Sequence, residues 1–267
     1  MTSRLGYIQN MATLAERISS WMRRQAQAAG ARGFVVGMSG GVDSAVVVRL
    51  CQLALPGHVV GVIMPCQSDP RDAEDAGRLA ERFSVPVVRL DLGSPYDALV
   101  GQLTAAAATL PDEQFKGGPS DDLKSRLPLA NVKPRLRMTT LFFVANSLNH
   151  LVAGTGNRSE IAIGYYTKYG DGGVDLLPIG GLFKSQVRAL ARELEVPAEI
   201  IDKAPSAGLW LGQTDEGEMG FTYDDLERYL TAGPDAVAPA IATRIDRLIR
   251  TSAHKRTLPP APDPGDA

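Results

Sequence analysis

The run Gly37-Met38-Ser39-Gly40-Gly41-Val42-Asp43-Ser44 is the most informative part of this chain. Apolar residues precede it at 33–36 and follow it at 45–50, the pattern of a buried strand, a tight turn and a helix. Such a turn places backbone N–H groups at a helix N-terminus, where the helix dipole favours an anion, and glycines there let the backbone approach a phosphate closely. Ser39 and Ser44 add hydroxyl donors, and Asp43 adds a carboxylate suited to Mg²⁺. The run therefore predicts a phosphate-binding turn.

Two common glycine-rich nucleotide-binding loops do not match this run, and a third does. It is not a Walker A loop, because no Gly-Lys-Ser/Thr follows, and it lacks the G-x-G-x-x-G spacing of dinucleotide-binding turns. The motif S-G-G-V-D-S at 39–44 resembles the pyrophosphate loop of the N-type ATP pyrophosphatases. That resemblance implies cleavage of ATP between its α- and β-phosphates, adenylation of a substrate oxygen and release of pyrophosphate. An ordinary glycine-rich turn is the structural alternative.

The rest of the chain alternates between strand-like and helix-like segments. Strands are expected over 34–37, 58–64, 85–90 and 151–154, and helices over 11–29, 44–55, 70–83, 95–109, 136–148, 185–194, 223–230 and 236–251. Strands separated by helices form parallel β-α-β units, and near-continuous apolar strands are typical of a sheet covered on both faces. We therefore expect an α/β fold with a doubly wound, mostly parallel sheet flanked by helices, and a helical C-terminal extension.

Two polar, glycine-containing segments interrupt this alternation. Residues 111–125 are expected to form a mobile loop, and residues 203–220 a second glycine-rich loop. The domain is expected to span 1–256, followed by a flexible proline-rich tail at 257–267.

Composition argues for an ordinary water-soluble enzyme. The 267 residues have a formal net charge of −2, which offers no electrostatic reason to expect nucleic acid or an anionic membrane as a partner. Only two cysteines, Cys51 and Cys66, are present, too few and too far apart for a disulfide framework or a zinc knuckle. We find no apolar run long enough to span a bilayer and no signal peptide, so a cytoplasmic location is expected.

Four further segments carry candidate site residues. Arg135 and Arg137 stand near a helix start, where arginines hold carboxylate or phosphate, although most surface arginines are solvated. Thr155 and Glu160 follow a strand, at the sheet edge where α/β proteins bind ligands, although Ser159-Glu160 also fits a helix cap. Lys184 precedes a helix and suits a phosphate.

The segment 164–175, G-Y-Y-T-K-Y-G-D-G-G-V-D, is dense in polar, aromatic and glycine residues that core packing does not explain. Its tyrosines can stack on flat rings, Lys168 can neutralise a phosphate, and Asp171 and Asp175 can accept from ribose hydroxyls or from ammonia. A disordered glycine loop is the alternative.

Taken together, the order and spacing of these blocks resemble the ammonia-dependent NAD synthetases over roughly 39–256. The loops 205–210 and 213–216 resemble the mobile loop of that family, and 254–256 its C-terminal substrate-binding element. The family's fold is that of the adenine nucleotide alpha hydrolases, and its reaction amidates deamido-NAD to NAD, with ATP converted to AMP and pyrophosphate. The resemblance also implies a homodimer with deamido-NAD at the subunit interface.

Position by position, the resemblance implies the following roles. ATP contacts fall on Gly37, Met38, Ser39, Gly40, Gly41, Val42, Asp43, Ser44, Thr155, Lys184 and Ser206. Contacts to deamido-NAD fall on Arg135, Lys168, Asp175, His254 and Lys255, and the Mg²⁺ ligands on Asp43 and Glu160. Lys184 and Asp171 are the catalytic candidates, the first for charge on the transferring group and the second for holding ammonium and removing its proton. Many relatives have threonine where this chain has Ser206, and Asp-His-Ala-Ala where it has 156–159.

Three other interpretations stay open at this point. One is another amide-forming or thiolating ATP pyrophosphatase, such as a GMP-synthetase-like or tRNA-modifying enzyme. A second is the synthetase module of a glutamine-dependent enzyme whose ammonia comes from a separate protein. A third is a nucleotide-binding regulatory module without catalysis, which the joint presence of Asp43, Glu160, Lys168, Asp171 and Lys184 disfavours.

Overall fold

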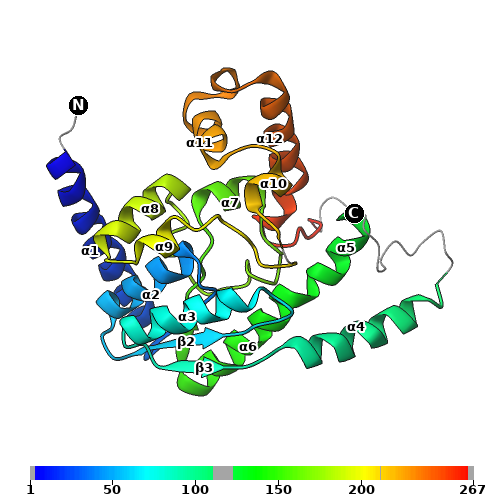
Figure 1. Ribbon diagram of the computed structural model, residues 1–267, viewed down its shortest axis with the longest axis horizontal. Helices are drawn as coiled ribbons and strands as arrows, with labels where there is room; N and C mark the ends of the chain where they lie inside the picture. The colour runs from blue at the N-terminus through cyan, green and yellow to red at the C-terminus, as the bar shows by residue number, and fades with distance from the viewer. Residues whose placement is uncertain (1–3, 111–122, 211, 264–267) are drawn as a thin grey trace.

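A computed structural model describes residues 4–110, 123–210 and 212–263. Its centre is a parallel sheet of four strands in the order β3-β2-β1-β4 (Figure 1). The strands are β1 (Gly33–Gly37), β2 (Val59–Ile63), β3 (Val87–Arg89) and β4 (His150–Val152). Strand β1 pairs with β2 on one side and with β4 on the other, so the chain reverses its direction of winding at β1. This is a doubly wound sheet, as the strand and helix alternation predicts.

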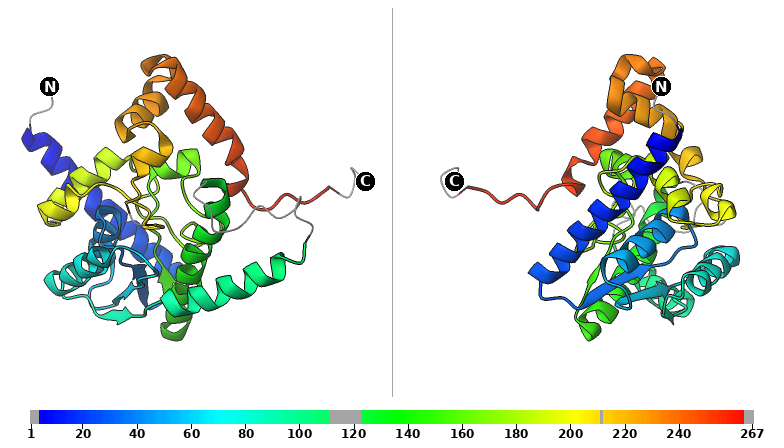
Figure 2. Two further views of the ribbon diagram at one scale, coloured as in Figure 1. Left: turned by 45° about the vertical axis from the view of Figure 1, so that its right-hand side comes forward. Right: turned by 90° about the vertical axis from the view of Figure 1, so that its left-hand side faces the viewer.

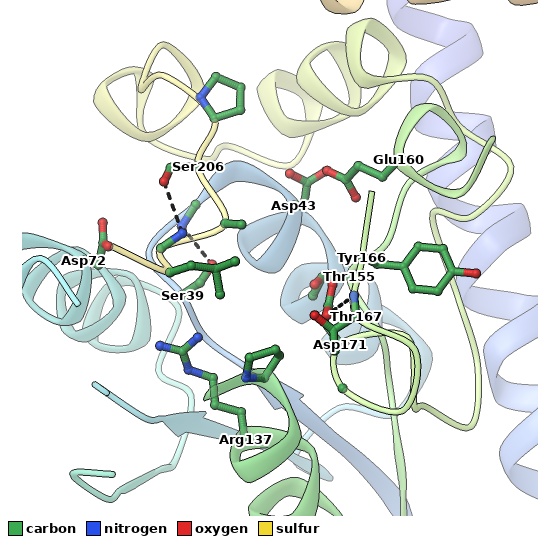
Figure 3. A pocket seen from close by; sticks show the side chains of 18 of the residues that line it. Ser39, Asp43, Asp72, Arg137, Thr155, Glu160, Tyr166, Thr167, Asp171 and Ser206 are labelled. Atoms are coloured by element: carbon green, nitrogen blue, oxygen red, sulfur yellow. Dashed lines mark hydrogen bonds between the residues drawn. The ribbon is translucent and has the colours of Figure 1, made fainter. Parts of the chain in front are cut away.

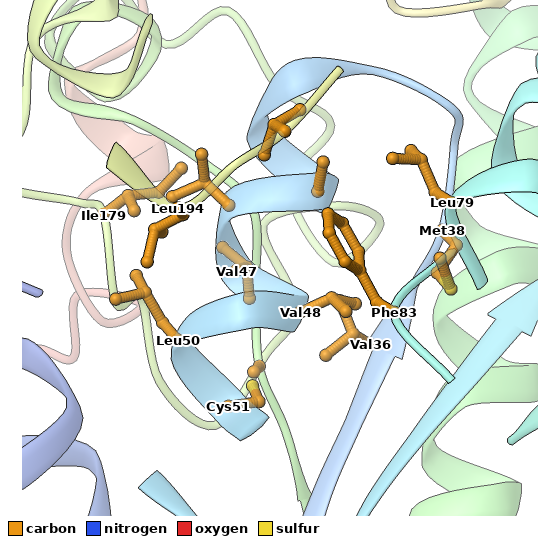
Figure 4. Packing of buried hydrophobic residues seen from close by; sticks show 14 of the residues in the cluster. Val36, Met38, Val47, Val48, Leu50, Cys51, Leu79, Phe83, Ile179 and Leu194 are labelled. Carbon is orange, nitrogen blue, oxygen red and sulfur yellow. The ribbon is translucent and has the colours of Figure 1, made fainter. Parts of the chain in front are cut away.

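Helices cover both faces of the sheet (Figures 1 and 2). One face packs on α1 (Arg4–Ala28), α2 (Val42–Ala54), α3 (Pro70–Arg82) and α8 (Lys184–Glu193), and the other on α4 (Gly93–Ala107) and α6 (Val132–Leu148). Alternate residues of β1 divide between the two layers, since Phe34 and Val36 join the first core while Val35 joins the second. Figure 4 shows the first core around α2, where Val47, Val48 and Leu50 are fully buried.

The remaining elements build the site side of the molecule. They are α5 (Leu123–Ala130), α7 (Arg158–Ile163), α9 (Ala198–Ile201), α10 (Asp215–Met219), α11 (Tyr223–Ala232), α12 (Pro239–Thr251) and the short 3₁₀ turns η1 (Pro234–Ala236) and η2 (Ala253–Lys255). Elements α7, α10, α11 and α12 share a small apolar core of their own that includes Ile163, Tyr223 and Ile245. Helices α10, α11 and α12 are the helical C-terminal extension, and α11 and α12 form the upper lobe in Figure 1.

Several boundaries differ from the sequence-based expectation. The expected loop 203–220 contains helix α10, which Thr214 caps by accepting from the Gly217 N–H at 3.3 Å. Residues 123–125 of the other expected loop begin helix α5, and its residues 111–122 lie outside the described part. Helix α6 begins at Val132 rather than 136, because Pro134 is tolerated in a first helical turn. Helix α12 begins at Pro239 rather than 236, after the turn η1.

Strand β3 departs from the expectation that both faces of the sheet are covered. Val87 and Val88 are 40% and 41% exposed at the edge of the sheet. Within one chain, these two apolar side chains of β3 are therefore not covered. Among the described residues, no helix has both the length and the apolar character needed to cross a bilayer.

Candidate active site

A cavity of about 470 Å³ opens at the carboxyl ends of β1, β2 and β4. Its walls come from the β1–α2 turn, the end of β2, the start of α7, the segment 164–174, Lys184 and the loop 203–209 (Figure 3). Doubly wound folds bind their ligands in this position, where the direction of winding reverses.

The β1–α2 turn forms the floor of this cavity. Gly40 has φ +76, and a Cβ there would lie 2.4 Å from the Asp72 carbonyl oxygen, so only glycine fits. Ser44 is buried, and its hydroxyl donates to the Gly41 carbonyl at 2.9 Å while the Ser39 N–H donates back to it at 3.3 Å. Ser44 therefore braces the turn from inside, and the N-terminus of α2 faces the cavity.

Three charged side chains meet above this floor, from α2, α7 and α8. The buried Lys184 ammonium is ion-paired with Asp43 Oδ2 and lies 3.6 Å from Glu160 Oε1. Asn157 joins Asp43 to the first turn of α7, which carries Glu160. Its side-chain N–H donates to Asp43 Oδ1 at 3.1 Å, and its side-chain oxygen accepts from the Glu160 N–H at 3.1 Å.

The helix-cap interpretation of this region is also correct, with a different residue. Asn157 and Glu160 form a reciprocal capping box at the start of α7, in which Glu160 Oε2 accepts from the Asn157 N–H at 3.1 Å. Glu160 Oε1 remains for the cavity. One carboxylate thus both caps a helix and takes part in the charged centre.

Burial sets the acidity of this centre. Burial and the neighbouring charge of Asp43 raise the pKa of Glu160, while the Lys184 charge opposes them. Burial alone would lower the pKa of Lys184, but Asp43 and Glu160 outweigh it and raise that pKa. Lys184 therefore stays cationic beside Asp43, whereas Glu160 binds a proton more readily than an ordinary glutamate.

These residues fit a magnesium ion. The Lys184 ammonium already shows that a positive charge is stabilised between Asp43 and Glu160. Among the residues that the structure describes, no group of three histidine, cysteine, aspartate or glutamate side chains has the spacing of a metal cage. Two carboxylates without a full protein cage suit Mg²⁺, which usually keeps several waters and takes phosphate oxygens as its other ligands.

The Glu160→Gln substitution should stabilise the metal-free protein relative to the wild type more at pH 8 than at pH 5, with the difference growing by up to about 1.4 kcal/mol per pH unit. The pKa of Glu160 rises from 4.5 to about 8 on folding. Between these pH values the folded protein binds a proton that the unfolded chain has lost, so wild-type stability falls as pH rises. Glutamine does not titrate. Urea unfolding in EDTA at pH 5, 6.5 and 8 tests this, and a difference that is constant with pH would contradict it.

The segment 164–175 is ordered rather than a disordered glycine loop. Asp171 Oδ1 accepts from the Thr167 N–H at 2.8 Å, and a Cβ at Gly172 would lie 2.5 Å from the Tyr166 ring, so the loop closes tightly on itself. Burial raises the pKa of Asp171, and its hydrogen bond to the Thr167 backbone opposes the shift. Figure 3 shows Asp171 at the cavity wall beside Thr155. The carboxyl group of Asp171 is therefore a weaker acid, and its carboxylate a stronger base, than in an ordinary aspartate.

The residues expected to bind the dinucleotide gather at the rim of the cavity. Lys168 Nζ donates to the His254 carbonyl at 2.6 Å, and Arg135 donates to the Lys168 carbonyl at 3.5 Å. Lys255 Nζ donates to the Gly164 carbonyl at 2.7 Å and lines the cavity. Asp175 is turned toward the sheet, where Oδ2 accepts from the Val152 N–H at 2.7 Å.

Most of the expected contact residues line the cavity, and some do not. Those that line it are Gly37, Met38, Ser39, Gly41, Val42, Asp43, Thr155, Glu160, Asp171, Lys184, Ser206 and Lys255. Within the described part of the chain, the lining does not include Gly40, Ser44, Arg135, Lys168, Asp175 or His254.

The loop 203–209 lines the cavity and is held to the rest of the molecule by three contacts. Lys203 pairs with Asp72 at 2.8 Å and Asp75 at 2.6 Å on α3. The Asp215 N–H donates to the Pro205 carbonyl at 3.0 Å, which joins the two stems of the loop. Lys133 donates to the Leu209 carbonyl at 2.8 Å from the first turn of α6. The loop therefore forms the roof of the cavity.

Replacing Lys133 by Met should loosen this roof. Lys133 is 5% exposed, and its ammonium lies 5.2 Å from the centre of the Tyr96 ring. Methionine keeps the apolar stem in that position but cannot donate to Leu209. A hydrogen bond from a charged group contributes about 1.5–3 kcal/mol, so we expect the KM for ATP to rise about tenfold. Limited proteolysis should also cut the variant faster within 206–210. Unchanged KM and cleavage rates would show that Lys133 does not hold the loop.

Sequence reasoning names Arg137 among its candidates and Asp215 only within a loop, and it assigns neither a role in this site. Arg137 lines the cavity and donates to the Met64 carbonyl at 3.2 Å and to Ser68 Oγ at 2.9 Å, so of the two arginines it is the one inside. Its spacing from Arg135, two residues on a helix, was the available signal that the two point in different directions. Asp215 also lines the cavity, but in the sequence it stands within an expected loop.

Known proteins resemble this chain over most of its length. The family model for NAD synthase matches residues 14–259. The NH(3)-dependent NAD(+) synthetase of Carboxydothermus hydrogenoformans is 49% identical over 247 residues, which cover 92% of this chain and 96% of that protein. That of Alkaliphilus oremlandii is 44% identical over 96% of this chain and 99% of that protein.

Two solved structures extend the comparison to three dimensions. The NMN synthetase from Francisella tularensis has a TM-score of 0.83 and 34% identity, covering 95% of this chain and 98% of that one. The NH3-dependent NAD synthetase from Campylobacter jejuni has a TM-score of 0.75 and 28% identity, covering 95% of this chain and 99% of that one. The expected adenine nucleotide alpha hydrolase fold is thereby confirmed.

Proposed function

Because this chain belongs to the NAD synthase family, we propose that it is a ligase that amidates deamido-NAD to NAD, with ATP and ammonia as co-substrates. The observation that supports the proposal most strongly is the centre formed by Asp43, Glu160 and Lys184 above a phosphate-binding turn, in a cavity that also holds Asp171. A regulatory nucleotide-binding module would not need this arrangement. A cytoplasmic location remains part of the proposal, because the reaction consumes ATP.

The first half-reaction uses the floor of the cavity. The turn at 39–41 and the N-terminus of α2 bind the β- and γ-phosphates of ATP. The nicotinate carboxylate of deamido-NAD attacks the α-phosphorus, the bond to the bridging oxygen breaks, and pyrophosphate leaves. Lys184 stabilises negative charge on the phosphate oxygens. Mg²⁺ held by Asp43 and Glu160 would supply further charge neutralisation at these oxygens.

The second half-reaction uses the opposite wall. Ammonia attacks the carbonyl carbon of the acyl-adenylate, AMP leaves, and one proton must be removed from the nitrogen. Asp171 holds ammonium and accepts that proton in this proposal; its raised pKa supports the role, because it makes the carboxylate a stronger base than an ordinary aspartate. The loop 203–209 keeps water from the adenylate.

A mononucleotide substrate is the second candidate. The structural match to an NMN synthetase, with a TM-score of 0.83, favours it. Three residues at the rim of the cavity distinguish the two candidates, namely Arg135, Lys168 and His254. They lie outside the cavity lining, so they can contact only a substrate that extends beyond it, as the larger dinucleotide does.

The decisive assay supplies ATP, Mg²⁺ and ammonium with either deamido-NAD or nicotinate mononucleotide. We expect NAD, AMP and pyrophosphate in equal amounts from the dinucleotide, with a higher kcat/KM than for the mononucleotide. The reverse preference would establish the second candidate. Glutamine free of ammonium serves as a further arm, from which we expect no NAD.

We also propose that the enzyme is a homodimer. Strand β3, α4 and α6 expose a set of large apolar side chains, namely Val87, Val88, Leu90, Leu99, Leu103, Phe143 and Leu148. Helix α4 projects from the body of the molecule in Figures 1 and 2, with Tyr96 its single buried residue among those described. Apolar patches of this kind mark association surfaces, and a second copy presents the same self-complementary face.

The Phe143→Glu substitution should convert this dimer to monomers, because Phe143 is 73% exposed in one chain and a charge there would be buried in the dimer. Light scattering after size exclusion should give the mass of two chains for the wild type and of one chain for the variant. A wild type that is monomeric at micromolar concentration would contradict the proposal. The variant Thr243→Glu, at an exposed position of α12 in the C-terminal lobe, is the control for a charge as such.

A further inference from the structure

Asp215 is a buried carboxylate, and among the described residues one of its oxygens has no hydrogen-bond donor. It is 4% exposed and lines the cavity. The Tyr223 hydroxyl donates to its Oδ2 at 2.8 Å, but Oδ1 has no hydrogen-bond partner among the described residues. Tyr165 lies near Asp215, but its single hydrogen is donated to Glu218 Oε2 at 2.8 Å. An unpaired buried carboxylate oxygen is costly, so its retention needs an explanation.

The position of Asp215 relates it to the charged centre. Tyr223 is 2% exposed, and its hydroxyl also lies 3.4 Å from Glu160 Oε1. Its ring centre lies 5.1 Å from the Lys184 ammonium. Tyr223 therefore stands between Asp215 and the centre, and the charges of Asp215, Asp43 and Lys184 act on one another.

The number and spacing of the carboxylates define what Asp215 can do. It does not form a three-carboxylate cage with Asp43 and Glu160 within the described residues. An outer position therefore suits Asp215, because Mg²⁺ keeps waters that need acceptors beyond the ligands. Among the described residues, Oδ1 is a buried acceptor without a partner, on a residue that lines the cavity.

We propose that Asp215 is an outer carboxylate of the cation centre: Oδ2 fixes the Tyr223 hydroxyl beside Glu160, and Oδ1 accepts from a water bound to the cation. This inference rests on the proposed function, because it assumes a cation at Asp43 and Glu160. It makes Asp215 a positioning residue, and it joins the roof to the centre, since the Asp215 N–H also closes the loop stem at Pro205.

The test is cation affinity rather than turnover. Mn²⁺ is titrated into the full chain saturated with α,β-methylene-ATP, and free Mn²⁺ is followed by electron paramagnetic resonance. Asp215→Asn keeps an acceptor for Tyr223 but replaces the free oxygen with a donor, so we expect the Kd for Mn²⁺ to rise at least about tenfold. Tyr223→Phe should raise it in the same direction.

A matched pair of variants controls for position. Tyr229 on the α11 helix donates to Asp246 on α12 in the same lobe; Asp246 is exposed, Tyr229 is partly buried, and both lie outside the cavity lining. Asp246→Asn should therefore leave the Kd for Mn²⁺ unchanged. Metal-free Asp215→Asn should unfold at the same temperature as the wild type or higher, because it loses a buried unpaired charge.

The outcomes separate this inference from the proposed function. If Asp43→Asn weakens Mn²⁺ binding and Asp215→Asn does not, the role of Asp215 is overturned and the cation centre stands. If Asp43→Asn binds Mn²⁺ as the wild type does, the centre itself is overturned. A lower unfolding temperature with unchanged Mn²⁺ affinity would make Asp215 merely structural. If Asp215→Asn does not fold, Tyr223→Phe decides, and an unchanged Kd in that variant overturns the inference.

Discussion

Asp43→Asn is expected to lower kcat about 10³-fold or more while leaving the fold intact. The carboxylate of Asp43 contacts Lys184 and Asn157 at the phosphate floor, and a charge at a metal and phosphate site stabilises the transition state by several kcal/mol. Asparagine has the same shape, and Lys184 keeps Glu160 as its partner at 3.6 Å. The measurement is single-turnover release of pyrophosphate, with circular dichroism as the check on folding.

The control for this loss is Asp246→Asn, which removes an exposed aspartate far from the cavity and should keep wild-type turnover. A folded Asp43→Asn enzyme with near-normal release of pyrophosphate would remove Asp43 from the mechanism. The phosphate turn would then act through its backbone alone.

Asp171→Asn should separate the two half-reactions. We expect pyrophosphate to be released in a first turnover at close to the wild-type rate, while NAD formation falls about 10²-fold. The reason is that Asp171 faces the cavity from the 164–175 segment, apart from the phosphate floor, and acts on nitrogen rather than phosphorus. The acyl-adenylate should accumulate and be detectable after acid quench.

The pH dependence offers a second measure of the same variant. Because burial raises the pKa of Asp171, its basic form appears at a higher pH than for an ordinary aspartate, and wild-type NAD formation should rise with pH over that range. The rise of NAD formation that reflects Asp171 should be absent from Asp171→Asn. In that variant the rate should depend on pH only through the concentration of free ammonia. An equal fall in pyrophosphate release and NAD formation would show that Asp171 organises the whole site instead.

The phosphate floor was predictable because its chemistry is local. The run 37–44 specifies a strand, a turn and a helix by neighbouring residues alone, and the order of strands and helices then requires a parallel sheet. The place of Thr155 and Glu160 followed from the same rule, since residues after parallel strands meet at one edge. The predicted helices are all present with shifted ends, as local signals for helix ends are weak, whereas α5, α9 and α10 were not predicted.

The roof and the outer residues were not predictable, because their contacts join distant parts of the chain. Lys133 meets Leu209 across 76 residues, and Tyr223 meets Glu160 across 63. Neither spacing carries a periodic signal. Strand β3 misled for another reason. Its valines have the composition of a covered strand, but the cover we propose is a second copy, which no pattern within one chain can show.

Asn157 gives the cavity a property of its own. One side-chain amide donates to the Asp43 carboxylate and accepts from the Glu160 backbone N–H, and these two residues stand 117 positions apart in the chain. An amide neither gains nor loses a proton, so the brace stays the same whether the cell is acidic or alkaline. A histidine at that place would become doubly donating near neutrality and would release Glu160 from its cap. The alignment of Asp43 and Glu160 therefore depends on no titration of the residue that joins them.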